Sequence, residues 1–70
     1  MNKELWKAIA ENLKSVRDER GVTQAEVAKS AGLNTNYYAK VERGEARATL
    51  TTLEKIIKAL GTDSSKILPF

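Results

Sequence analysis

Residues 23–44, TQAEVAKSAGLNTNYYAKVERG, are the stretch of the sequence that decides the fold. Thr23 and Glu26 have the spacing of a capping box, in which each side chain hydrogen-bonds the backbone amide of the other residue at the start of a helix. The helix that they open is predicted to end at Gly32, because glycine readily takes the left-handed backbone conformation that stops a helix. The first half of the stretch therefore predicts a short helix followed at once by a tight turn.

The second half of the stretch predicts another short helix. Asn34 is a good N-cap, and the helix is expected to run from Thr35 to Arg43, with Gly44 as its stop. Ala28 is small where two steeply crossing helices would bring their backbones together. The apolar residues that would pack between these helices and the rest of the chain are Val27, Ala31, Leu33, Tyr38 and Val41. Together these features predict a helix-turn-helix unit over about residues 24–43, with a generic helical hairpin as the alternative.

The flanking segments are also predicted to be helical. A first helix is expected from about Lys3 to Arg20, and a fourth is expected to be capped by Thr51 and to end at Gly61. Asp63 would cap a last short turn over Ser64–Leu68. The apolar stripes that support these helices are Trp6, Ile9, Ala10, Leu13 and Val16 in the first, and Leu53, Ile56, Ile57 and Leu60 in the fourth. The sequence therefore predicts an all-α, compact five-helix bundle that forms one domain over residues 1–70.

The amino-acid composition argues against several classes of function. The 70 residues include no cysteine and no histidine, so neither a disulfide nor a zinc site with sulfur or nitrogen ligands is expected, and no metal or cofactor is predicted. Catalytic constellations built on histidine or cysteine cannot form, which argues against an enzyme. No apolar run reaches the length of a membrane span, and a cytoplasmic location is expected. The formal net charge of +3 is a mild indication of an acidic partner.

The motif resembles the Cro and phage-repressor (XRE-type) helix-turn-helix family over about residues 12–68. The matching pattern is Thr23-Gln24-x-x-Val27-Ala28-x-x-x-Gly32-Leu33, then Tyr37-Tyr38-x-x-Val41-Glu42-Arg43-Gly44, then Thr49-Leu50-x-x-Leu53-x-x-Ile56-x-x-x-Leu60. The resemblance implies a lambda-repressor-like fold that binds double-stranded DNA. The chain departs from the pattern at Ala46 and Ala48, where many relatives carry arginine and proline, and at Tyr38, where isoleucine or valine is usual.

The resemblance implies that the helix beginning at Thr35 is a recognition helix that lies in the DNA major groove. It places base contacts at Thr35, Asn36 and Lys40, whose side chains suit adenine, guanine or thymine edges. Contacts with the DNA backbone are expected from residues near the helix ends and the following loop, which can meet phosphates. These residues are Gln24, Asn34, Tyr37, Arg43 and Arg47. For each of these side chains, an ordinary solvated surface residue is the alternative.

Arg17 and Glu42 are predicted to form a structural ion pair. Each residue stands at the edge of an apolar stripe, where a lone charge would be costly. In the family that the chain resembles, an arginine and a glutamate at these places pair across the fold. We therefore expect the pair to support the fold rather than to contact DNA.

A homodimer is expected, because one recognition helix reads few bases, whereas two related by a two-fold axis read half-sites about 34 Å apart on a pseudo-palindromic operator. The candidates for a dimer surface are Trp6, Ile67, Leu68 and Phe70, with packing in the core of the monomer as the alternative. The favoured function is a sequence-specific transcriptional regulator, most simply a dimeric repressor. The alternatives are a controller protein of a restriction-modification system, which can activate as well as repress, and an antitoxin or other module that binds a protein partner.

Overall fold

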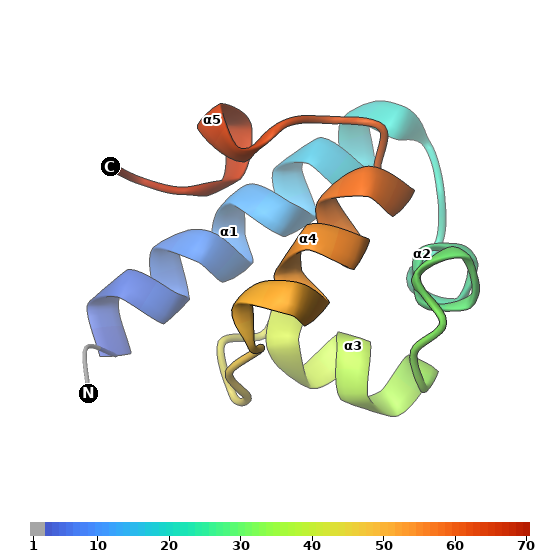
Figure 1. Cartoon of the computed structure of the whole chain (residues 1–70), viewed down its shortest axis with the longest axis horizontal. Coiled ribbons are helices and arrows are strands. Elements are labelled where there is room, and N and C mark those ends of the chain that lie inside the picture. Colours follow the sequence, from blue (N-terminus) through green and yellow to red (C-terminus); the bar gives the residue numbers. More distant parts are fainter. Residues whose placement is uncertain (1–2) are drawn as a thin grey trace.

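Residues 3–70 are described by the computed structural model, and every regular element in this range is a helix. The five helices are α1 (Lys3–Arg20), α2 (Gln24–Ala31), α3 (Thr35–Glu42), α4 (Leu50–Ala59) and α5 (Ser64–Ile67). The prediction of an all-α, five-helix fold is confirmed for this part of the chain. The long α1 packs against α3 and α5, while α4 packs against α2 and α5 (Figure 1).

The turn between α2 and α3 forms as the sequence predicts. The amide of Glu26 donates to Thr23 Oγ1 at 3.1 Å and the amide of Thr23 donates to Glu26 Oε1 at 2.9 Å, so both bonds of the capping box are present. Gly32 has a φ of +72°, which is the left-handed conformation that a side chain would disfavour. Asn34 then caps α3 by accepting hydrogen bonds from the amides of Asn36 and Tyr37. Local sequence alone therefore fixes the spacing of these two helices.

The observed start of α4 and the observed end of α5 differ from the prediction. α4 is capped by Thr49, whose hydroxyl accepts from the amide of Thr52 at 3.1 Å, so the helix begins at Leu50 and the expected cap at Thr51 is wrong. α5 ends at Ile67 rather than at Leu68. Leu68 takes an extended backbone conformation because a residue that precedes proline is disfavoured in the helical region.

A single cluster of buried side chains joins the helices. Its largest fully buried member is Tyr38, the residue that departs from the family pattern by its size. The other members are Ile9, Leu13, Val16, Val27, Ala28, Ala31, Val41, Ala48, Leu53, Ile56, Leu60 and Ile67. Trp6, Leu33 and Ile57, which were expected to point inward, are only half-buried at the edge of this cluster. The core therefore uses one face of each helix and leaves the outer face of α3 in solvent.

No helix within residues 3–70 has both the length and the apolar character that crossing a membrane requires. The same residues hold no group of acidic side chains that could bind a metal ion.

Candidate nucleic-acid interface

α3 has one buried face and one polar face. Tyr38 and Val41 are 0% and 1% exposed, respectively, and fix the orientation of the helix against the core. Thr35, Asn36 and Lys40, the predicted base contacts, are all exposed. The only carboxylate of this helix belongs to a buried residue, so the outer face carries hydrogen-bonding and cationic groups without an acidic one. Such a face matches the electronegative edges of bases in a major groove.

Two predicted backbone contacts lie near the starts of α2 and α3, and both have partners within the chain. The Asn34 side-chain oxygen accepts from the amides of Asn36 and Tyr37 at 2.8 and 3.2 Å, so it serves as the N-cap of α3. The Gln24 side-chain amide donates to Glu42 Oε1 at 3.1 Å. A phosphate at this place would therefore meet a side-chain amide whose position is already fixed by Glu42.

The remaining predicted backbone contacts are Tyr37 in the first half of α3, Arg43 at its C-cap and Arg47 in the loop that follows. The Tyr37 hydroxyl donates to the carbonyl of Arg47 at 3.1 Å, which ties the loop to α3. The exposed Arg43 guanidinium pairs with Glu45 at 3.1 Å. The Arg47 side chain is exposed. This end of α3 therefore carries two arginines, of which one is already paired with a carboxylate.

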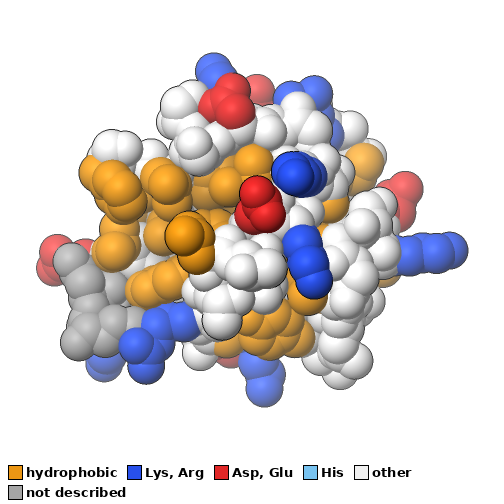
Figure 2. Space-filling model, in the orientation of Figure 1, with side chains coloured by type: hydrophobic (Ala, Val, Ile, Leu, Met, Phe, Trp, Pro, Cys, Tyr) orange, Lys and Arg blue, Asp and Glu red, His pale blue; other side chains and the backbone are white. Residues whose placement is uncertain are grey.

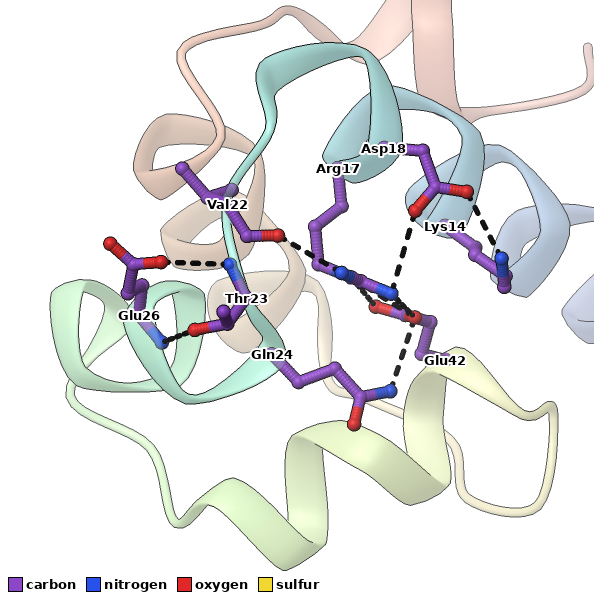
Figure 3. Close-up of polar contacts among 8 residues, drawn as sticks. All are labelled: Lys14, Arg17, Asp18, Val22, Thr23, Gln24, Glu26 and Glu42. Carbon is purple, nitrogen blue, oxygen red and sulfur yellow. Dashed lines mark hydrogen bonds and ion pairs between the residues drawn. The ribbon is translucent and has the colours of Figure 1, made fainter.

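Arg17 and Glu42 lie in direct contact between α1 and α3 (Figure 3). Arg17 Nη2 is 2.8 Å from Glu42 Oε1, and Arg17 Nε is 2.9 Å from Oε2, so the guanidinium engages both carboxylate oxygens. The Glu42 side chain is 2% exposed and the Arg17 side chain is 15% exposed. Arg17 Nη1 also donates to the carbonyl of Val22 at 2.9 Å. The pair therefore links α1, the α1–α2 loop and α3, and Gln24 adds α2 to the same network.

Charges in this network shift the pKa values of its members. Burial opposes ionisation of Glu42, but the hydrogen bonds from Arg17 and the groups around it hold its pKa below the ordinary value. The hydrogen bond with Glu42 raises the pKa of Arg17. Burial and the neighbouring Glu42 carboxylate raise the pKa of Tyr38. The side chains of Arg17 and Glu42 are therefore both charged at neutral pH, while Tyr38 remains protonated.

The predicted dimer residues lie in different environments. Ile67 is 0% exposed in the core, so the expectation that it contributes to a dimer surface is corrected: its side chain closes α5 onto the rest of the fold. Phe70 is 87% exposed and Leu68 is half-buried. Trp6 is half-buried at the start of α1, in a cleft that it shares with the loop after α3. Of the four candidates, Phe70 is therefore the one that is fully available to a partner, and Ile67 is not available.

Leu50, on α4, is an exposed apolar residue outside the predicted dimer candidates. Leu50 is 81% exposed, and it lines a shallow hollow of about 460 Å³ together with Leu53, Ile57 and Leu68. Figure 2 shows hydrophobic side chains gathered over α4 and the C-terminal segment on this face of the molecule. The signal was present in the sequence: with Thr49 as the cap, Leu50, Leu53 and Ile57 follow a helical spacing.

Two short helices held at a tight turn, with a polar and cationic outer face on the second, define a helix-turn-helix nucleic-acid-binding module. The helix-turn-helix family profile matches residues 13–67, and the chain belongs to this family. The resemblance recognised in the sequence is thereby confirmed.

Three known proteins illustrate the relationship. The chain is 37% identical over 60 residues to the immunity repressor protein of Bacillus phage phi105. This alignment covers 86% of this chain but only 42% of the repressor. The chain is 40% identical over 60 residues to the control protein C.SmaI of Serratia marcescens, covering 86% of this chain and 71% of that protein. The solved tetramer of the restriction-modification controller C.Esp1396I with its natural 35 base-pair operator has a TM-score of 0.82 and 30% identity, covering 87% and 80% of the two chains.

Proposed function

We propose that this protein is a sequence-specific DNA-binding transcriptional regulator that inserts α3 into the major groove of an operator. The observation that carries the proposal is the exposed set Thr35, Asn36 and Lys40 on a helix whose opposite face is locked in the core. An α-helix with its side chains is about 10–12 Å in diameter. The major groove of B-DNA is also about 12 Å wide. Cytoplasmic action, and the absence of an enzymatic role, remain parts of this proposal.

Each base-contacting residue has a defined role in the proposal. Asn36 pairs its side-chain amide with adenine, Lys40 donates to the acceptors of guanine, and Thr35 contacts a base edge or a thymine methyl group. Asn34, at the start of α3, faces the flanking phosphates together with Gln24. Arg43 and Arg47 face phosphates at the other end of the helix. Phosphate contacts position the protein, and base contacts give it specificity.

A homodimer completes the proposal, because one eight-residue helix reads only a few base pairs. The overall dimensions of 28 × 22 × 20 Å allow two copies side by side to place their α3 helices about one DNA turn apart, roughly 34 Å. Leu50 is a large, exposed apolar side chain that lines the hollow between α4 and α5, and Phe70 is exposed two residues beyond Leu68, which lines the same hollow. We propose that a second copy covers Leu50 and Phe70. A relative forms a tetramer on its operator, which supports assembly on DNA.

One named relative is a control protein and another is a restriction-modification controller, and this favours a controller as the second candidate within the same class. A controller and a repressor would use the same α3 surface and the same dimer. They would differ in whether transcription from the bound promoter rises or falls. A reporter gene behind the selected operator, measured with and without the protein, separates the two.

Selection from random duplex DNA tests the proposal. The purified protein is expected to enrich a motif with two-fold symmetry and half-site centres about one helical turn apart. In sedimentation experiments, Leu50→Asp is expected to weaken self-association, whereas Ser30→Asp on the exposed surface of α2 serves as the matched control. Failure to enrich any motif at moderate salt would contradict the proposed function. Enrichment of a single half-site without symmetry would contradict the proposed dimer but not the proposed DNA binding.

A further inference from the structure

A cleft of about 500 Å³ lies between the start of α1 and the loop that follows α3. The side of the cleft formed by α1 carries Lys3, Trp6 and Lys7, and the side formed by the loop carries Arg43, Glu45 and Arg47. Nothing in the family resemblance or in the base-reading surface uses the three residues of α1. Figure 2 shows cationic side chains gathered at the edge of the molecule where α1 begins.

The cleft is fixed in position relative to α3. Gly44 has a φ of +77°, and a Cβ atom at this position would lie 3.6 Å from the Cα of Lys7, so the backbone of the loop rests against α1. The Tyr37 hydroxyl holds the other end of the loop through the carbonyl of Arg47 at 3.1 Å. Any ligand that contacts α3 at its C-terminal end therefore meets this cleft at a defined distance and orientation.

The charges of the cleft are strongly unbalanced. Four cationic side chains face one carboxylate, that of Glu45, and this carboxylate already pairs with Arg43 at 3.1 Å. Among the residues that the structure describes, Lys3, Lys7 and Arg47 take part in no ion pair, and all three are exposed. Three uncompensated cations around one concave surface create a positive potential that favours an anionic ligand with several charges.

We infer that this cleft binds the DNA phosphodiester backbone, and that Lys3 and Lys7 provide a second anchoring point outside the helix-turn-helix unit. The inference rests on the proposed function and extends it. A helix in the major groove has a sugar-phosphate strand near each of its ends, and the cleft lies beside the C-terminal end of α3. Arg47 and the two lysines would contact consecutive phosphates of that strand. Such contacts raise affinity for every DNA sequence equally and carry no base specificity.

The dependence of DNA affinity on salt tests the inference. Each phosphate contact contributes about 0.9 to the slope of log K against log salt concentration. The variant Lys3→Gln/Lys7→Gln is expected to reduce the magnitude of this slope by about 1 to 2, and to bind the selected duplex at least tenfold more weakly at low salt. The control Lys55→Gln/Lys66→Gln removes the same charge from exposed positions on α4 and α5, and is expected to retain the slope of the unaltered protein.

Uncharged phosphate analogues in the DNA identify the phosphates that Lys3 and Lys7 contact. Methylphosphonate substitutions are placed one at a time along the selected duplex, and those at the anchoring point are expected to weaken the unaltered protein but not Lys3→Gln/Lys7→Gln. Trp6 is the single tryptophan of the chain and lines the cleft, so DNA should protect its fluorescence from quenching by acrylamide.

Equal slopes for the lysine variant and the control, or no methylphosphonate position that depends on the lysines, would overturn the inference while leaving the proposed function intact. Equal slopes together with capture of an acidic protein by the cleft would assign it to a protein partner instead. Absence of any DNA binding by the unaltered protein would refute the proposed function itself.

Discussion

Removal of Arg17 is predicted to destabilise the fold far more than removal of any exposed cation. In Arg17→Met the Glu42 carboxylate, which is 2% exposed, loses the guanidinium and keeps the hydrogen bond from the Gln24 side-chain amide. Breaking a buried pair by removing one partner costs about 3–5 kcal/mol. If Glu42 instead becomes protonated, the cost at pH 7 is about 1.36 kcal/mol for each pH unit above its ordinary pKa of about 4.3, or about 3.7 kcal/mol. Both routes give a similar loss.

This loss is large for a chain of 70 residues, whose total stability is about 4–10 kcal/mol. It corresponds to a decrease in melting temperature of at least about 12 °C. The assay is urea unfolding followed by circular dichroism at pH 7, with Lys14→Met as the matched control. Lys14 pairs with Asp18 at 3.0 Å, but both side chains are more than half exposed, so this variant is expected to unfold at nearly the same urea concentration as the unaltered protein.

Two further variants separate loss of the pair from loss of packing. Arg17→Leu/Glu42→Leu removes both charges and is expected to recover most of the stability, since an apolar replacement of a buried pair is often neutral. In Arg17→Met, burial without the guanidinium raises the pKa of Glu42 above its unfolded value. The loss should therefore be greatest at neutral pH and shrink toward pH 4. A loss for Arg17→Met no greater than that for Lys14→Met would refute the reasoning.

Three other predictions concern caps and acid stability. Thr49→Ala should cost about 1 kcal/mol of unfolding free energy by chemical denaturation, because it removes the α4 cap, whereas Thr51→Ala should change it little; an equal loss for both would contradict the assigned cap. Gly32→Ala should cost about 1–2 kcal/mol, because its φ of +72° is strained for alanine, and an unchanged urea midpoint would exclude that strain. The lowered pKa of Glu42 contributes stability above about pH 4.3, and this stability is lost as the pH falls through the lower pKa of the folded state. Glu42→Gln should therefore weaken the decrease of unfolding free energy at acid pH. An unchanged decrease in this variant would attribute the acid sensitivity to other carboxylates.

The helix-turn-helix unit could be predicted from the sequence because its determinants are local. Thr23 and Glu26 cap α2, Gly32 ends it, and Asn34 caps α3, all within a span of 12 residues. Each of these signals acts on backbone groups within four residues of itself. The exposed face of α3 followed from the same register, because the positions of Tyr38 and Val41 set which side chains point away from the core.

The features that the sequence did not reveal depend on contacts between distant residues. α5 has only four residues, too few for a helical periodicity to decide whether Ile67 faces the core or a dimer partner. The structure places Ile67 in the core, and its carbonyl accepts from Asn12 Nδ2 at 2.8 Å, across 55 positions. The sequence predicts a phosphate contact or an ordinary surface position for Gln24, and does not reveal its hydrogen bond to Glu42, because that bond spans 18 positions. The cap of α4 is ambiguous in the sequence because three threonines precede Leu53. The extended backbone at Thr49 and the hydrogen bond that its hydroxyl accepts from the amide of Thr52 select the first of them.

The central claim, that α3 reads bases, is tested most directly by the specificity of Asn36→Ala on the selected operator. The unaltered protein should prefer the selected base over a substituted one by about 1–3 kcal/mol at the position that Asn36 contacts in each half-site. The variant should bind both duplexes equally at that position while keeping its preference at all others. Retention of the full preference at every position by Asn36→Ala, and likewise by Lys40→Ala and Thr35→Ala, would show that α3 does not read the bases.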